Sequence, residues 1–481
     1  MIDAVVLIVY LCAMVLVGWR SRGRSAESYW VADRNCGTPR ISVSLIATTF
    51  GASSTIGIIG LGYSRGLTAA WWSLVGAIAL LPFGFVLAAR VRALRVYTLP
   101  DIIEHAYGKQ VSVPAATMIV VAWCGVVAAQ MIAGARLISG VMALEYSLAL
   151  AVVAVVFVLY TFWGGQLSVL RTDIWQLGLF LAALAICAAF VIRAFQADGG
   201  SVLGSVPDGH FSFPVSDSFG WYELLVFYPL IVGLPYLVGP DIYSRILCAR
   251  NNSVAKRSTL ISAMAIVPIS LMLALLGTLL TGLYPGLGQD TALPTAIREL
   301  VPIGLSGVVT AGFLAAIMSS ADTTLVSAAT ILSLNVVGAH RAISEDVQLP
   351  MTKIALLCVG FAAWLIAGFQ QGIISSLLLA YTVFVGGVVF PTLASFYRER
   401  LRITPKGAMW AVVVGGTAAI LGEINDGSLL AALFTEHGDA LLRQLLGPSY
   451  TSILPIVLSL LIMVTVSWAT STSTRSAPSN E

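Results

Sequence analysis

Long apolar stretches follow one another along this chain, and this repetition limits what it can fold into. A helix that crosses a bilayer needs about 20 consecutive, mainly apolar residues. Thirteen stretches fit this pattern, at residues 2–18, 40–63, 68–90, 112–141, 146–164, 171–193, 221–246, 258–284, 303–336, 352–371, 374–396, 407–424 and 451–470. Only 10% of the 481 residues are charged, whereas soluble domains carry about 25%. The sequence therefore predicts an all-α membrane protein with 13 transmembrane helices.

Basic residues are distributed unevenly between alternate loops. If the N-terminus lies outside, twenty-one of the 26 Lys and Arg residues fall on the inner side and four on the outer side, and Arg136 lies within a span. Cytoplasmic loops are enriched in Lys and Arg. The first stretch begins with Asp3, and a cleaved signal peptide would have a basic start. We therefore expect a multi-pass protein of the cell (inner) membrane, with a retained first helix, an outer N-terminus and a cytoplasmic C-terminus.

Two of the predicted spans are interrupted by glycine and proline. One contains the sequence FGASSTIGIIGLG, and the other contains YPLIVGLPYLVGPDIY. These residues break the helical hydrogen-bond ladder, and such backbone survives at membrane depth where it lines a cavity. The two spans each open a run of five, so the two runs have opposite topology. Matched breaks in inverted halves indicate a substrate site, although glycine and proline are also frequent in ordinary membrane helices.

The stretch 308–334 combines the apolar character of a span with polar residues at its centre. Ala316, Ser319, Ser320 and Thr323 fall on one helical face. Such a stripe can pack against another helix, or its oxygens can bind a hard cation. Asp322 lies beside the stripe, and a carboxylate at membrane depth is costly and usually functional.

Signals for an enzyme are weak in this sequence. The six cysteines and four histidines follow no metal-binding or disulfide spacing. No nucleophile elbow or phosphate loop is present, and topology accounts for the net charge of +3. We therefore expect neither catalysis nor nucleic-acid binding.

Several motifs resemble the sodium:solute symporter family. They occur in the family's order from about residue 25 to 395, and they read ESYWVADRN, SLIATTFGASSTIG, TLPDIIEHAYG, YTFWGGQLSVLRTDIWQ, PYLVGPDIYSRILCAR and AAIMSSADTTL. IAGARLISG and YLVGPDIYSR are most similar to the sodium/proline symporter branch. The resemblance implies a leucine-transporter-type fold with an inverted repeat of five plus five helices, and solute uptake coupled to sodium.

The resemblance divides the chain into five segments. These are the first helix and inner loop (1–39), inverted repeat 1 (40–195), an outer loop (196–220), inverted repeat 2 (221–396), and two further helices with a short cytoplasmic tail (397–481). It also implies one sodium site. Its ligands would be backbone carbonyls and two hydroxyls, from Ala47, Phe50, Ala316, Ser319 and Ser320.

The substrate is less well defined by the resemblance than the family. Proline symporters have an aspartate where this chain has Thr49 and a tryptophan where it has Ser53, but they share Tyr236. Thr49 and Ser54 are similar to the polar first helix of sialic-acid and sugar members. The expected substrate-binding residues, which include one basic residue, are Thr49, Ser53, Ser54, Trp72, Arg136, Tyr236 and Phe384.

Some polar residues have two interpretations. Asp173, Asp322 and Thr323 resemble a second, inner sodium site found in some family members, but Asp173 is also placed as a first-turn acid of a helix. Arg136 either extends to the membrane interface or pairs with a substrate carboxylate. Aromatic residues such as Trp72 and Phe384 line the cavity or simply pack.

Three functions remain open from the sequence. The leading one is a sodium-coupled symporter that imports a small organic solute by alternating access, with an amino acid or carboxylate favoured. Its partners would be the solute, sodium ions and the lipid bilayer. Proton coupling through Asp322 is one alternative, and a transporter-like sensor that acts with a separate signalling protein is another.

Overall fold

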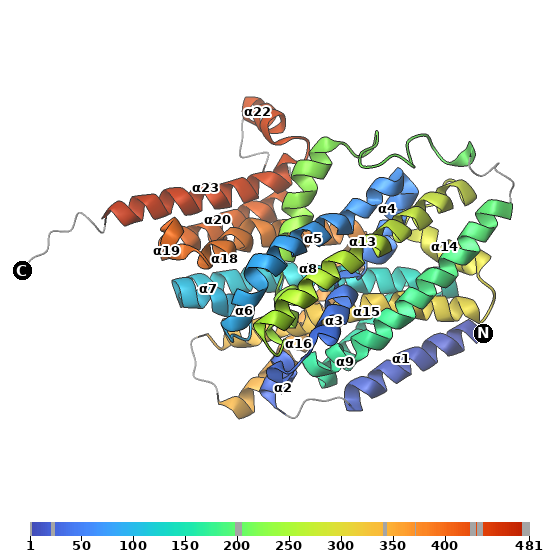
Figure 1. Cartoon of the computed structure of the whole chain (residues 1–481), viewed down its shortest axis with the longest axis horizontal. Helices are drawn as coiled ribbons and strands as arrows, with labels where there is room; N and C mark the ends of the chain where they lie inside the picture. Colours follow the sequence, from blue (N-terminus) through green and yellow to red (C-terminus); the bar gives the residue numbers. More distant parts are fainter. Residues whose placement is uncertain are drawn as a thin grey trace, which may run out of the picture.

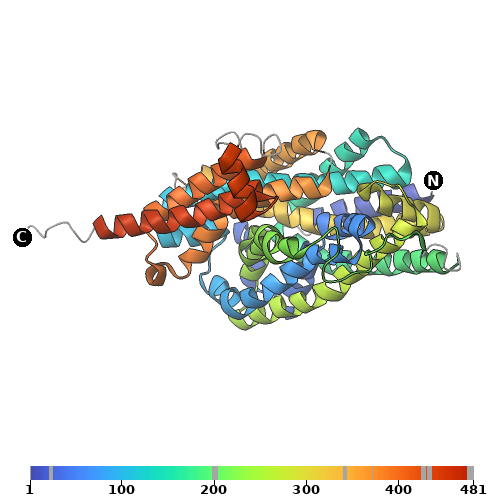
Figure 2. The same ribbon diagram turned by 90° about the horizontal axis from the view of Figure 1, so that it is seen from above.

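The computed structural model describes residues 2–20, 25–197, 204–339, 344–370, 372–423, 430 and 436–473. In these ranges the regular structure is helical, apart from two isolated β-bridges, which confirms the predicted all-α class. The helices lie side by side, many of them along the long axis of the molecule (Figures 1 and 2). Parts of the predicted inner loop, outer loop, twelfth span and C-terminal tail lie outside the described residues.

Ten helical stretches in the described ranges are long and apolar enough to cross a membrane. Two of them, Ser53–Ala93 and Tyr146–Ala197, contain 41 and 52 residues. At 1.5 Å per residue these would extend about 60 and 80 Å, whereas the hydrocarbon core is about 30 Å thick. Each of the two stretches is therefore long enough to hold more than one crossing.

The first interrupted span folds as a helix, a break and a second helix. It consists of α3 (Thr38–Thr49), the π-helical segment η2 (Ser53–Gly57) and α4 (Ile58–Arg65). Phe50 leaves the helical conformation at φ −88° and ψ 59°. A Cβ at Gly51 would lie 2.5 Å from the Ser320 hydroxyl and 2.7 Å from the Gln130 side-chain oxygen. Glycine is therefore needed here because neighbouring side chains approach the backbone closely.

The second interrupted span also breaks, at Gly239. It runs through η5 (Glu223–Phe227), η6 (Pro229–Gly233), α11 (Leu234–Val238) and α12 (Pro240–Leu247). Gly239 is extended, with ψ 131°, because a residue before proline is pushed out of the helical region. Asp241 follows in the first turn of α12. The breaks predicted from glycine and proline are therefore present in both spans.

Further helices surround these two. Between the breaks lie α5 (Trp71–Pro82), η4 (Phe83–Leu87), α6 (Ala88–Ala93), the short α7 (Leu99–Tyr107), α8 (Lys109–Met142) and α9 (Tyr146–Ala197). After α12 come α13 (Asn252–Leu283), α14 (Ala292–Leu300), α15 (Leu305–Ile331) with η8 (Leu332–Val337), α16 (Glu345–Phe369), and α17 (Ile373–Phe384) with η9 (Val385–Val389) and α18 (Phe390–Ser395). At the N-terminus lie α1 (Ile2–Arg20) and the short α2 (Ala26–Val31), and the C-terminal part holds α19 (Arg398–Leu401), α20 (Pro405–Glu423), α22 (Glu436–Leu446) and α23 (Tyr450–Ser473).

Helix α9 changes direction at Gly165, whose φ is +59°. A Cβ there would lie 2.4 Å or more from the ring atoms of Tyr29, so glycine serves both the conformation and the contact. The kink falls between the two predicted spans 146–164 and 171–193. It brings Thr161 and Asp173, on opposite sides of the kink, to the same central helix, α15.

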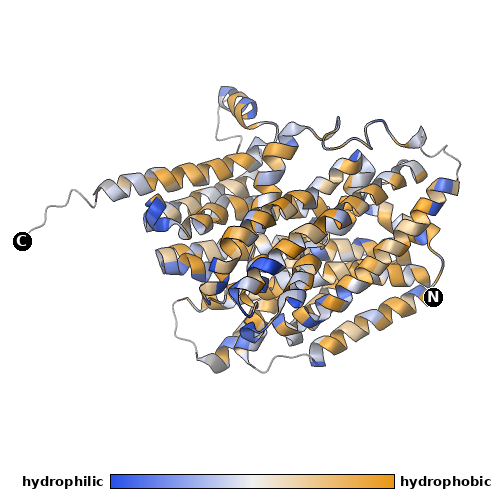
Figure 3. Ribbon diagram, in the orientation of Figure 1, coloured by the Kyte–Doolittle hydropathy of each residue, from blue (hydrophilic) through white to orange (hydrophobic). Residues whose placement is uncertain are grey.

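Helix α15 lies at the centre of the molecule, where every residue from Val309 to Ile331 is buried. It packs against α9, α8, α1 and α16. On the outside of the molecule, large apolar side chains such as Trp175, Met264 and Phe369 are exposed. Figure 3 shows apolar residues along the full length of most helices, with polar residues concentrated near helix ends and loops. A surface of this kind suits lipid, because soluble proteins rarely expose so much apolar area.

Several helix pairs touch backbone to backbone, among them α4 with α13 and α9 with α15. Helices α4 and α13 meet where Gly277 faces the carbonyl of Ile59 and where a Cβ at Gly62 would lie 2.5 Å from the carbonyl oxygen of Ala274. Helices α9 and α15 meet where a Cβ at Gly312 would lie 2.7 Å from the carbonyl oxygen of Leu179. Small residues permit this approach in membrane helices, where association relies on packing.

Candidate functional site

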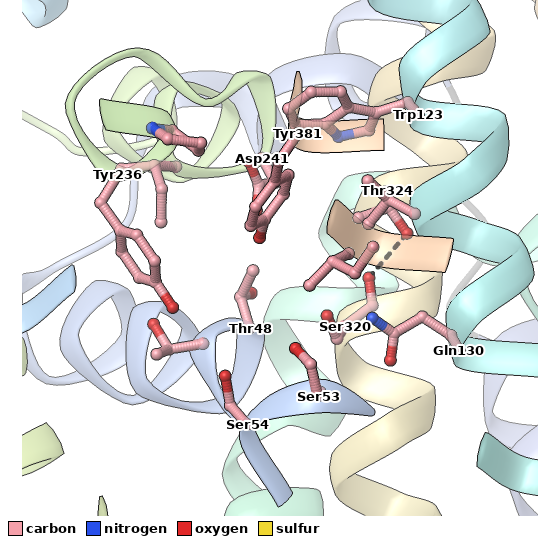
Figure 4. Close-up of a pocket in the computed structure, with 16 residues that line it drawn as sticks. Thr48, Ser53, Ser54, Trp123, Gln130, Tyr236, Asp241, Ser320, Thr324 and Tyr381 are labelled. Atoms are coloured by element: carbon pink, nitrogen blue, oxygen red, sulfur yellow. Dashed lines mark hydrogen bonds between the residues drawn. The ribbon is translucent and has the colours of Figure 1, made fainter. Parts of the chain in front are cut away.

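A cavity of about 30 Å³ lies between the two broken helices and α8, α15 and α17. Most of its lining side chains are polar or aromatic: Thr48, Thr49, Ser53, Ser54, Trp123, Gln130, Tyr236, Asp241, Ser320, Thr324 and Tyr381, together with Gly51, Val126, Pro235, Ile242 and Leu377. Figure 4 shows the labelled side chains directed toward a common space. The volume is close to that of one or two waters, so a bound organic solute requires the cavity to widen.

Hydrogen bonds from nearby side chains stabilise the break after α3. Gln130 of α8 accepts a hydrogen bond from the Ala52 amide, at 2.7 Å. The Thr55 hydroxyl donates to the Gly51 carbonyl at 2.6 Å. Backbone groups freed by a helix break need partners when they are buried. Gln130 therefore stabilises the break while it also lines the cavity.

The carbonyl end of α3 points toward the break. Helix α3 ends at Thr49, and the Phe50 amide still donates to the Ile46 carbonyl, so the carbonyls after Ile46 are the ones that lack an intrahelical amide one turn further on. This end carries the negative pole of the helix dipole, which favours a cation. Ser320 of α15 lies against the same break, because its hydroxyl is the nearest atom to the space beside Gly51. A cation placed here meets backbone carbonyls and hydroxyl oxygen.

Aromatic residues form another side of the cavity. The Tyr236 ring packs against Gly76 of α5, and Trp123 and Tyr381 lie together in Figure 4. Two aromatic residues expected at the substrate do not line the cavity. Phe384 packs behind Trp123 with ring centroids 4.7 Å apart, and Trp72 packs edge-on against Tyr228 at 5.7 Å.

Asp173 of α9 does not line the cavity. It lies in a cluster of oxygen atoms. The Ser319 hydroxyl donates to it at 2.6 Å, and the Ser44 hydroxyl donates to its other oxygen. The Arg245 guanidinium lies 3.4 Å from the same carboxylate, and both side chains are fully buried. Arg245 also donates to Thr48 at 3.3 Å and to Thr323. Asp173 is thus paired with a cation that belongs to the protein.

Asp322 faces a different neighbourhood from Asp173. Its Oδ1 accepts a hydrogen bond from Thr161 at 3.0 Å, and its Oδ2 has no hydrogen-bond partner among the described residues. The side chain is fully buried. Of the three residues expected at a second sodium site, the structure brings Asp173 and Thr323 to one guanidinium, and it directs Asp322 toward Thr161.

Arg136 lies away from the cavity. Its guanidinium carbon is 5.1 Å from the centre of the Tyr146 ring, at the α8–α9 connection. Burial raises the pKa of the nearby Asp290 in the loop after α13, and the positive charge of Arg136 opposes this shift. Arg136 therefore contacts residues near the end of the helix bundle and not the cavity-lining residues.

Sequence reasoning found part of this site. Thr49, Ser53, Ser54 and Tyr236 line the cavity as expected, because they flank the predicted breaks. Further residues that reach the cavity or Asp173 are not predicted from the sequence: Thr48, Trp123, Gln130, Asp241, Arg245, Thr324 and Tyr381. Arg245 was counted with the inner loops, although it is buried in α12. Its position in a predicted span, four residues after Asp241, was the available signal.

The sequence matches known proteins over most of its length. The family model "Sodium:solute symporter family" matches residues 29–415. A "Sodium/glucose cotransporter" of Vibrio parahaemolyticus is 25% identical, with 86% of this chain and 83% of that protein covered. A "Sodium/myo-inositol cotransporter 2" of Mus musculus is 24% identical, with 98% and 77% covered.

Two solved structures have similar folds. A Na+-coupled sialic acid symporter in a substrate-bound outward-open state aligns with a TM-score of 0.77 at 18% identity, over 98% of both chains. The nucleobase-cation symporter Mhp1 in a closed conformation aligns with a TM-score of 0.62 at 13% identity, over 94% and 96%. At these identities the likeness concerns the fold, which is that of leucine-transporter-type carriers. With the family model covering most of the chain, the protein is a membrane transporter and not an enzyme, and it belongs to the sodium:solute symporter family.

Proposed function

We propose that this protein imports a small organic solute together with sodium, by alternating access around the cavity between the two broken helices. The observation that carries the proposal is the meeting of three features at one place. Helix α3 ends at the cavity, Ser320 of α15 lies against that end, and the polar cavity lies directly beside it. Solute and sodium would then bind next to each other, which gives a physical route for coupling.

The proposed sodium ligands are the carbonyls of Ala47, Phe50 and Ala316 and the hydroxyls of Ser319 and Ser320. All are neutral oxygens, and sodium as a hard cation suits such ligands. The helix end supplies two of these carbonyls together with a favourable dipole. The Ser319 hydroxyl donates a hydrogen bond to Asp173 at 2.6 Å. If its oxygen also binds sodium, Ser319 links the ion to Asp173 and so to α9.

A second sodium at Asp173, Asp322 and Thr323 is a further proposal, with a condition attached. Arg245 lies 3.4 Å from Asp173 and donates to Thr323. A sodium ion at this position must therefore displace the guanidinium. With Arg245 in place, the charge of Asp173 is balanced, and one coupled sodium per solute is the simpler stoichiometry.

Proton coupling is the alternative, and one observation favours it. Asp322 is fully buried and its Oδ2 has no hydrogen-bond partner among the described residues. A buried carboxylate without a cation is costly, so a proton on Asp322 would remove the cost. A sensor that works with a signalling partner would use the same cavity without net transport.

We also propose thirteen crossings, with the N-terminus outside and the C-terminus in the cytoplasm of the cell that makes the protein. The long stretches Ser53–Ala93 and Tyr146–Ala197 would contain additional crossings, because Gly66 and Gly165 interrupt them. The five segments 1–39, 40–195, 196–220, 221–396 and 397–481 would then follow the inverted-repeat plan. The N-terminal end of α1 and the C-terminal end of α23 lie at opposite ends of the molecule (Figure 1). This arrangement fits termini on opposite sides of the membrane.

Uptake into proteoliposomes tests the proposal. Purified protein is reconstituted, and labelled amino acids, monocarboxylates, sugars and nucleobases are offered with an inward sodium gradient, an inward proton gradient or neither. We expect concentrative, saturable uptake of one class with the sodium gradient. Uptake that follows the proton gradient in sodium-free buffer would assign coupling to a proton. Sodium-dependent binding without uptake would favour the sensor.

A further inference from the structure

One residue gives the cavity a charge. Among the side chains that line it, only Asp241 is charged at neutral pH. It lies in the first turn of α12, directly after the break at Gly239. A carboxylate removed from bulk water is costly unless a positive group pairs with it. The question is which group balances this charge when the site is occupied.

Among the described residues, no basic side chain forms a salt bridge with Asp241. Arg245 follows Asp241 by one helical turn, but it lies within ion-pair distance of Asp173, at 3.4 Å. Its Nε donates to Thr48 instead. The N-terminus of α12 contributes a partial positive charge, which is worth about 0.3–1 kcal/mol in ordinary settings. The charge of Arg245 acts on Asp241 only through space, so neither group forms a direct ion pair with this carboxylate.

The surroundings of Asp241 also suit a cation. Asp241, Tyr381 and Trp123 lie on one side of the cavity, and Tyr236 flanks them (Figure 4). Aromatic faces attract ammonium groups, most strongly when water is excluded. The indole nitrogen of Trp123 is buried and has no hydrogen-bond partner among the described residues, so its N–H can donate to an acceptor atom of the solute other than the ammonium group. Ser53 and Ser54 lie on the opposite side, with neutral hydroxyls.

We propose that the solute carries a protonated amine or quaternary ammonium group, and that Asp241 binds it and determines specificity. This inference rests on the proposed function, since it concerns the same cavity. The ammonium group lies between Asp241, Trp123 and Tyr381. The remainder of the solute extends toward Ser53 and the adjacent sodium site. A zwitterionic amino acid places its carboxylate at that end, and a simple monocarboxylate leaves Asp241 unbalanced.

Matched compounds test the charge requirement on the parent protein. Thermal stability of the detergent-purified protein is measured in sodium chloride and in potassium chloride with three pairs: L-alanine and L-lactate, ethanolamine and ethylene glycol, and choline and its uncharged carbon analogue. D-glucose and myo-inositol are included as neutral polyols. We expect the ammonium member of at least one pair to stabilise the protein in sodium, with an affinity at least tenfold above its partner.

Substitution at Asp241 tests its role. Asp241→Asn should reduce the affinity for the ammonium compound at least tenfold and abolish its advantage over the uncharged partner. Asp241→Glu should keep that advantage in part. The effect of sodium alone on stability should remain in both variants, because the proposed sodium ligands are intact. Glu299→Gln is the matched control, since Glu299 is half-exposed beside Arg298, and it should leave the discrimination unchanged.

The outcomes separate this inference from the proposed function. If glucose, myo-inositol or lactate binds in sodium as tightly as every ammonium compound, the inference is overturned while sodium symport stands. If sodium stabilises the protein but no ammonium compound binds, the inference is likewise overturned. If sodium has no effect on stability or on any solute, the proposed function itself fails. Should Asp241→Asn not fold, Trp123→Leu supplies the second variant, with the same expected loss for ammonium compounds.

Discussion

At the scale of single residues, Arg245 and Asp173 form the one salt bridge of the described residues in which both side chains are fully buried. Both side chains are fully buried and lie 3.4 Å apart. Removing one member of such a pair leaves an unbalanced charge, which costs about 3–5 kcal/mol. Removing both members is far less costly. Comparing single and double variants of this pair therefore tests whether Arg245 stabilises the protein through its charge or through its packing.

Arg245→Gln should lower the thermal stability of the purified protein strongly, and adding Asp173→Asn should restore part of the loss. The measurement is the midpoint of thermal unfolding for the two single variants and the double variant. Sodium should stabilise Arg245→Gln more than the parent, since Asp173 then has no other cation. A double variant that is no more stable than Arg245→Gln would show that the guanidinium acts through packing.

Ser320 provides a second prediction at the same scale. Its hydroxyl lies against the α3 break at Gly51, where sodium is proposed to bind. Ser320→Ala places a methyl group where an ion ligand was, so it should raise the sodium concentration for half-maximal uptake about tenfold or more. Ser327, on the same helix, has a hydroxyl without a hydrogen-bond partner among the described residues. Ser327→Ala therefore serves as the control. If uptake by both variants depends equally on the sodium concentration, Ser320 is not a sodium ligand.

At the scale of elements, the interrupted helices were the most predictable part of the site. Glycine and proline located the breaks at Phe50–Ala52 and Gly239, and the residues around them, such as Ser53 and Tyr236, line the cavity. The sequence could not assign Gln130 or Tyr381, because they reach the site from α8 and α17 through tertiary packing. Helix periodicity shows which residues share a face, but it does not show which partner that face meets.

Burial gives one basic residue a role that the charge count does not indicate. Arg245 is one of the 21 basic residues that this count places on the inner side. The structure places it inside the bundle, paired with Asp173. The family resemblance also groups Asp322 with Asp173 at a second sodium site. The kink at Gly165 directs Thr161 toward Asp322 and Asp173 toward Ser319, and no local pattern predicts this separation.

The close contact between α4 and α13 gives a prediction for an element. A Cβ at Gly277 would collide with the backbone carbonyl of Ile59, and overpacking of this kind costs about 1–3 kcal/mol. Gly277→Ala should therefore lower the unfolding midpoint. Gly178→Ala on α9 is the control, because a Cβ there meets nothing within 4 Å, and it should be neutral or slightly stabilising. Similar losses for both variants would contradict the contact.

At the scale of the whole molecule, the proposed orientation rests on the distribution of basic residues and can be checked by labelling. Asp208 and Asn252 are exposed, and they are expected on the outer and inner side respectively. Asp208→Cys should react with a membrane-impermeant thiol reagent in intact cells, and Asn252→Cys should react only in inside-out vesicles. The parent protein measures background labelling of its own cysteines. The reverse pattern would invert the topology and reassign inner and outer loops.

The backbone contacts described for α4 with α13 and for α9 with α15 bear on how such a molecule moves. Helices that meet without intervening side chains cannot slide past each other easily, so each pair should behave as one rigid body. The cavity lies between these bodies, with Ser54 near one and Ser320 on the other. At the cavity they face each other through hydroxyls such as those of Ser54 and Ser320, beside the proposed sodium ion. Opening and closing of the cavity would then be a change in the distance between two rigid bodies. A bound sodium ion would hold these bodies together, and its release would let them separate.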